Sequence, residues 1–140
     1  MRPPHVQAFI DRALPYARHA SEATGVPVSV VLSQWGVESG WGTNHLSEGN
    51  NLGSIAHLGR YVSYPTLDAF IDDWVRVLCL PLYTRVRTAA ASGKDPVAVA
   101  TLLAESPHSE SHYREGSHPV GWLLVRVLKD FQLAEFDDAE

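Results

Sequence analysis

Apolar residues recur at helical spacing along most of this chain. Between His5 and Ala23 they fall three or four residues apart, and similar patterns return in later segments. A period near 3.6 residues is typical of amphipathic helices that bury one face. The sequence therefore predicts a mainly α fold with about six helices, over residues 5–23, 27–39, 67–80, 81–91, 96–105 and 119–133.

Glycine, proline and capping residues mark the ends of these helices. Gly25 follows the first helix, and Pro27 stands at or near the first turn of the second. Thr66 and Asp95 are suitable N-cap residues for two later helices. No break in composition divides the chain, so we expect a single domain over residues 1–140.

Residues 43–65 interrupt the helical pattern. Glycine and asparagine crowd this segment, which is typical of turns rather than of a continuous helix. We expect an irregular lobe here, with a short β-hairpin between Ile55 and Val62. The acidic residues 136–140 are expected to form a frayed tail.

Composition and charge exclude several classes of protein. The net charge is −5, and no dense cluster of lysine and arginine is present, which argues against binding to nucleic acid. No segment approaches the roughly 20 apolar residues of a membrane-spanning helix. The first residues lack the apolar core of a secretory signal peptide. There is no glycine-rich phosphate loop, and we expect no cofactor. We also expect a monomer.

Glu38 stands at the end of the second helix, before Ser-Gly-Trp-Gly. The negative end of the helix dipole and the apolar neighbours both favour a protonated carboxyl group. Such an acid can protonate the leaving oxygen of a glycosidic bond, as the general acid of lysozyme does. Gly40 and Gly42 would let a bulky substrate approach, and Trp41 offers a face for a sugar ring. A solvated glutamate followed by a helix-ending glycine is the simpler alternative.

The segment QWGVESGWGTNHL, residues 34–46, resembles the signature of family 73 glucosaminidase domains, of the flagellar-muramidase and autolysin type. Weaker matches follow in the same order: Gly49–Leu52 with Ile55, then Tyr64 with the helix that contains Phe70. The resemblance implies a lysozyme-like α fold, a groove beside the short lobe, and peptidoglycan as substrate, cleaved at a β-1,4 bond. It implies that Glu38 is the general acid and that Trp41, Asn51 and Tyr64 contact the substrate.

The sequence offers several candidates for the second catalytic group. The family's lobe is usually longer and in some members brings a second carboxylate, whereas residues 53–64 contain neither Asp nor Glu. Glu48 and Glu110 are the available carboxylates, and Tyr113 matches a family tyrosine. Substrate assistance by an N-acetyl group would need no second acid. We assign Glu110 and Tyr113 to catalysis because residues 106–118 are expected to cross the groove.

Three histidines lie in the same polar loop. The spacing of His108 and His112 fits a zinc site, but neighbouring serines and glycine predict a loop, and the HExxH pattern is absent. We therefore expect no metal, and we assign His108 and His112 to contact with solvent or sugar.

Three functional hypotheses follow from these patterns. The first is a peptidoglycan glycosidase, either an N-acetylglucosaminidase or a muramidase. The second is a lytic transglycosylase with the same acid, and the third is a non-catalytic wall-binding domain. Without a recognisable signal peptide, we expect synthesis in the cytoplasm and delivery to the periplasm or wall as an antibacterial effector or phage-type lysin. An effector would need a cognate inhibitor protein in the producing cell.

Overall fold

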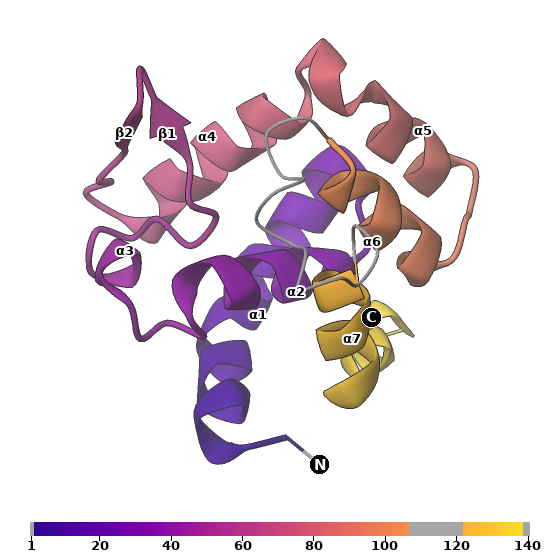
Figure 1. The fold of residues 1–140 in the computed structure, drawn as a ribbon, viewed down its shortest axis with the longest axis horizontal. Helices are drawn as coiled ribbons and strands as arrows, with labels where there is room; N and C mark the ends of the chain where they lie inside the picture. The colour runs from indigo at the N-terminus through magenta and orange to yellow at the C-terminus, as the bar shows by residue number, and fades with distance from the viewer. Residues whose placement is uncertain (1, 107–121, 139–140) are drawn as a thin grey trace.

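The computed structural model describes residues 2–106 and 122–138, and its described part is mainly helical. This confirms the predicted mainly α, lysozyme-like fold. Figure 1 shows the helices gathered around α2, with a small two-stranded lobe at one side. The α helices are α1 (Pro4–Thr24), α2 (Val28–Ser39), α3 (His45–Glu48), α4 (Leu67–Leu78), α5 (Thr84–Ala91), α6 (Pro96–Ala104) and α7 (Trp122–Asp130).

Helix α2 forms the centre of the hydrophobic core. It packs against α1, α6, α7 and the C-terminal 3₁₀ helix η2 (Leu133–Asp138). Ten of its twelve residues are buried, among them Trp35, whose ring meets Phe70 and Trp74 edge to face. A helix that is surrounded in this way has a fixed position, so it is a rigid platform for any side chain at its end.

The predicted helix ends agree with the structure where a cap was recognised. Gly25 has a φ of 81°, the left-handed conformation that glycine adopts without strain, and its N–H donates to the Ser21 carbonyl. Thr66 accepts from the Ala69 N–H, and Asp95 accepts from the Ala98 N–H. Both are therefore N-caps, as the sequence predicts.

The lobe contains the predicted hairpin in a minimal form. Strands β1 (Ala56–His57) and β2 (Arg60–Tyr61) are antiparallel, with Ala56 opposite Tyr61. Leu58 and Gly59 join them with φ angles of 53° and 78°, the conformation of a tight hairpin turn. The sequence analysis missed the short helix α3, which Asn44 caps by accepting from the N–H groups of Leu46 and Ser47.

Two predictions about the second half of the chain were wrong in detail. Residues 81–91 do not form one α helix, because a 3₁₀ turn, η1 (Pro81–Tyr83), precedes α5. The end of the chain does not fray at Phe136 and Asp137 either. Asp137 accepts from the N–H and hydroxyl of Ser29, at 2.8 and 2.5 Å. Pro27 gives α2 no side-chain cap, so a carboxylate from the distant chain end supplies one.

Candidate active site

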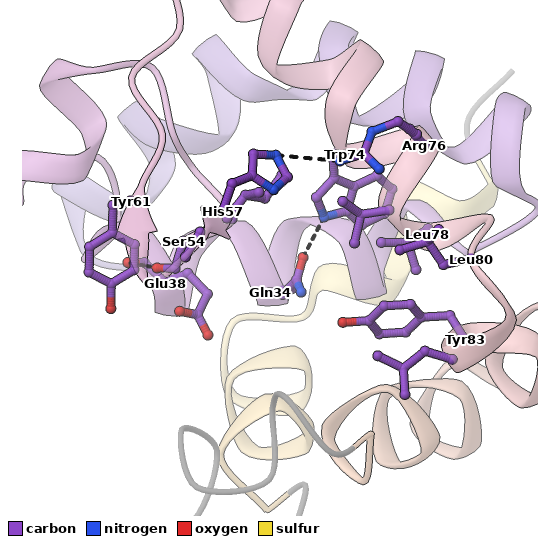
Figure 2. Close-up of a pocket in the computed structure, with 16 residues that line it drawn as sticks. Gln34, Glu38, Ser54, His57, Tyr61, Trp74, Arg76, Leu78, Leu80 and Tyr83 are labelled. Atoms are coloured by element: carbon purple, nitrogen blue, oxygen red, sulfur yellow. Dashed lines mark hydrogen bonds between the residues drawn. The ribbon is translucent and has the colours of Figure 1, made fainter.

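A cavity of about 490 Å³ lies between the lobe and the corner where α4 meets η1, with α2 as its floor. Figure 2 shows Glu38 on one side, Tyr83 on the other, and Gln34 between them. The lobe supplies one wall and the end of α4 with η1 supplies the other. The lining residues are Gln34, Glu38, Gly53, Ser54, Ile55, Ala56, His57, Gly59, Tyr61, Trp74, Arg76, Val77, Leu78, Leu80, Leu82 and Tyr83.

Glu38 reaches this cavity from the last turn of α2. The helix ends at Gly40, which has a φ of 60° and donates its N–H to the Gly36 carbonyl. The free carbonyl of Glu38 accepts from Asn44 Nδ2 at 3.0 Å and from Ser54 Oγ at 3.3 Å. Two segments of the lobe therefore satisfy a helix-end carbonyl and hold the Glu38 backbone in place.

A cluster of polar side chains lies at the rim, around Asp73 of α4. Its Oδ2 accepts from the Tyr64 hydroxyl at 2.5 Å and lies 3.1 Å from His57 Nε2, while its Oδ1 accepts from Arg76 Nε at 2.8 Å. His57 and Arg76 line the cavity. The cluster thus joins the hairpin to α4 across one edge of the opening.

The ionisation of this cluster follows from its hydrogen bonds. Burial acts to raise the pKa of Asp73, but the hydrogen bonds from Tyr64, Arg76 and His57 stabilise the carboxylate and bring its pKa below the ordinary value. Burial raises the pKa of Tyr64 strongly, and its bond to Asp73 adds to this shift. Tyr64 is thus a fixed hydrogen-bond donor at neutral pH.

The sequence model of one protein family matches residues 14–117. The family is glucosaminidase, described as mannosyl-glycoprotein endo-beta-N-acetylglucosaminidase. The chain belongs to the glucosaminidase family. The match contains Glu38, the lobe and the Asp73 cluster. At the level of the family, the protein is a glycosidase of the type that acts on peptidoglycan. Comparisons with curated proteins and with solved structures found no match.

Trp41, assigned to substrate stacking from the sequence, is not among the residues that line the cavity. Its ring packs edge to face on Phe9 and Phe131, with centroid distances of 5.7 and 5.3 Å. It also covers Gly36, where an added Cβ would lie 2.3 Å from the ring. The tryptophan of this glucosaminidase motif therefore fastens the turn after Glu38 to the core, and its contact with sugar stays a prediction.

Asn51 and Tyr64, the other predicted substrate contacts, serve the lobe itself. Asn51 is fully buried, donates to the carbonyls of Ile55 and Val62, and accepts from the Ile55 N–H. Every hydrogen bond that the structure records for this amide is thus to the lobe's own backbone. Tyr64 is 9% exposed and its hydroxyl is bound to Asp73. Their roles in substrate binding stay predictions.

The remaining predicted residues either lie outside the described part of the chain or do not line the cavity. Glu110, Tyr113, His108 and His112 lie outside the described residues. Glu48 is exposed in α3 and does not line the cavity. Within residues 2–106 and 122–138, no three His, Cys, Asp or Glu residues are grouped to hold a metal ion. No helix of this part is long and apolar enough to span a membrane.

The sequence analysis missed several residues that line the cavity. Gln34 carries a usable signal, because it lies four residues before Glu38 and shares its helix face. Tyr61 on β2 and Tyr83 on η1 carry none, because their position depends on how the lobe and the α4–η1 corner pack. The aromatic residues that line the described cavity are Tyr61, Trp74 and Tyr83, and Trp41 is not among them. Of the three, Tyr61 is the exposed one.

Proposed function

We propose that this protein hydrolyses β-1,4 glycosidic bonds in peptidoglycan strands, with Glu38 as the general acid. The observation that carries this proposal is the position of Glu38: it is the one carboxylate among the described residues that line the cavity of a glucosaminidase-family fold. A glycosidase needs a proton donor aimed at the leaving oxygen. The fixed backbone of Glu38 provides the rigid placement that such a donor requires.

The walls of the cavity suit a carbohydrate. Tyr61 is 54% exposed on the hairpin and can pack against a sugar ring. Tyr83 is 7% exposed and turns its hydroxyl toward the cavity from the opposite side, where it can form a hydrogen bond to a sugar. Arg76 and His57 add hydrogen-bond donors at the rim, where the carboxylates of peptidoglycan stem peptides would meet them.

Hydrolysis also needs a second group, which activates the attacking water or stabilises the intermediate. Inverting enzymes place two carboxyl groups roughly 6.5–9.5 Å apart, and retaining enzymes about 5 Å apart. Among residues 2–106 and 122–138, no second carboxylate lines the cavity. We therefore retain Glu110 and Tyr113 as the proposed partners, with the substrate's own acetamido group as the alternative. The same observation favours lytic transglycosylation as a second candidate, because that reaction needs no attacking water.

Mass spectrometry of digested sacculi separates these reactions. Hydrolysis adds one water to the new reducing end, and transglycosylation leaves an anhydro sugar of lower mass. A non-catalytic wall-binding domain would leave intact strands, which would overturn the proposal. The sugar at the new end also identifies the enzyme as an N-acetylglucosaminidase or a muramidase.

We further propose that the protein acts where peptidoglycan lies, in the periplasm or the wall. Expression in a bacterium with an added signal peptide should cause lysis, whereas cytoplasmic expression should not. Equal toxicity from the cytoplasm would show that the target is not the wall. Delivery as an antibacterial effector and inhibition by a cognate protein stay predictions, and an inhibitor that covers the cavity would contact Glu38 and Tyr61.

A further inference from the structure

Gln34 is a buried polar side chain on the floor of the cavity. It lies one helical turn before Glu38, on the same face of α2, and only 6% of its surface is exposed. Figure 2 shows it at the middle of the cavity, with its amide oxygen turned toward Trp74 and its nitrogen turned away. It is thus placed beside the general acid.

The orientation of this amide is fixed by Trp74. The indole Nε1–H of Trp74 donates to Gln34 Oε1 at 2.8 Å. Indole nitrogen is only ever a donor, so the atom that faces it must be the amide oxygen. The Gln34 Nε2 group consequently points away from Trp74.

Gln34 Nε2 has no hydrogen-bond partner in the described part of the chain. It is nevertheless not sealed off from solvent, because Trp35 Nε1 is the one fully buried side-chain polar atom without a partner among those residues. Water can therefore reach this donor in the free protein, and a ligand oxygen that takes the place of the water keeps the hydrogen bond. The cavity therefore contains a preoriented donor one turn from Glu38.

We propose that Gln34 Nε2 donates a hydrogen bond to the carbonyl oxygen of a substrate N-acetyl group, so that the site selects 2-acetamido sugars. This inference rests on the proposed function and names the specificity-determining residue of that site. An amide carbonyl is a stronger acceptor than a sugar hydroxyl, and every sugar of an unmodified peptidoglycan strand carries one. Nearby apolar side chains, including Val77 and Leu78, suit the acetyl methyl group. Trp74 is then a positioning residue, because its indole N–H holds the Gln34 amide.

The test compares two oligosaccharides that differ only at C2. Tetra-N-acetylchitotetraose carries the acetamido group there, and cellotetraose carries a hydroxyl. Binding of both is measured by calorimetry with a Glu38→Gln protein, which cannot cleave either. We expect this protein to prefer the acetamido sugar, and we expect Gln34→Glu or Gln34→Met in the same background to lose about tenfold of that preference. Cellotetraose binding should not change.

The two substitutions separate recognition from folding. Gln34→Glu keeps the acceptor for Trp74 but buries a carboxyl group, and Gln34→Met removes the acceptor without adding a charge. Each variant should lower the melting temperature for a different reason, so binding is compared at a temperature at which both are folded. Trp74→Phe frees the Gln34 amide to turn and should lower the preference for the acetamido sugar by less than the Gln34 variants do. An unchanged preference in both Gln34 variants would overturn the inference.

Failure of the proposed function would look different. A wild-type protein that leaves sacculi intact but prefers chitotetraose through Gln34 would refute catalysis and support the recognition inferred here. If the wild-type protein cleaves sacculi but the Gln34 variants keep the preference for chitotetraose, catalysis is supported and the role of Gln34 is refuted. A Glu38→Gln protein that shows no preference between the two sugars would also reject the role of Gln34.

Discussion

The two faces of α2 place very different demands on their side chains. On one face, Gln34 and Glu38 meet an open cavity. On the other, Trp35 and Ser39 are fully buried, and Gly36 lies under the Trp41 ring. The residues that line the cavity form a narrow strip of a helix whose remaining surface is mostly buried. Substitutions on the two faces should therefore separate activity from stability.

The sharpest test of this separation is Glu38→Gln, which keeps the volume of the side chain but cannot donate a proton. General acid catalysis contributes about 10²–10⁴-fold, so we expect a loss of that size in the rate of sacculus digestion. The melting temperature should stay unchanged. Glu22→Gln, an exposed carboxylate on α1, is the matched control and should keep full activity. If the Glu38→Gln protein digested sacculi at the wild-type rate, Glu38 would not be the general acid.

Gly36→Ala tests the packed face of the same helix. The new methyl group would lie 2.3 to 2.5 Å from three atoms of the Trp41 ring, which Phe9 and Phe131 hold in place. Overpacking of this kind should lower the free energy of unfolding by up to about 3 kcal/mol, despite the better helix propensity of alanine. Chemical denaturation measures the change.

The control for this substitution is Gly36→Ala introduced into a protein that already carries Trp41→Ala. With the ring removed, Gly36→Ala should become neutral or stabilising, so the two changes should be strongly non-additive. Additive effects would show that the ring is not the obstacle and would weaken the packing role assigned to Trp41.

Asn51→Ala extends the comparison to the lobe, whose backbone the Asn51 amide holds through three hydrogen bonds. The change leaves the Val62 carbonyl and the Ile55 N–H without the Asn51 partner, while the Ile55 carbonyl keeps its bond from the Val62 N–H. We expect a loss of about 2 kcal/mol, seen as faster amide hydrogen exchange in residues 51–64. Exchange in α2 should hardly change. Equal acceleration in both regions would mean that the lobe and the helices unfold together.

The smallest expected effect concerns Asp73 and pH. Because the folded pKa of Asp73 is depressed, the unfolded chain binds more protons as the pH falls. Its contribution to stability is thus present above the ordinary value of 3.8 and is lost as the pH falls through the lower folded pKa. Partners that are half exposed keep this contribution below about 1 kcal/mol.

Asp73→Asn should therefore flatten the acid side of the stability curve. The measurement is the melting temperature of wild type and variant between about pH 2 and pH 6, the range in which carboxyl groups titrate. The two melting temperatures should converge at the acid end of this range. A constant difference across this range would show that the ionised form of Asp73 is not favoured by folding.

Much of this protein could be predicted from local sequence. Helices formed where apolar spacing predicted them, and Gly25, Thr66 and Asp95 ended or began them as expected, because caps act on backbone groups only a few residues away. The motif around Glu38 likewise pointed to the glucosaminidase family, which the family comparison supports. Local interactions determined these features.

Tertiary packing decided which side chains meet the cavity. Trp41 follows Glu38 closely but turns to Phe9 and Phe131, whereas Tyr61 and Tyr83 come to the cavity from separate elements. The Gln34 amide is set by Trp74, forty residues further along the chain. Asp137 caps α2 across 108 residues. No spacing rule links such positions, because each contact forms only after the elements pack and a buried polar group must find its partner there.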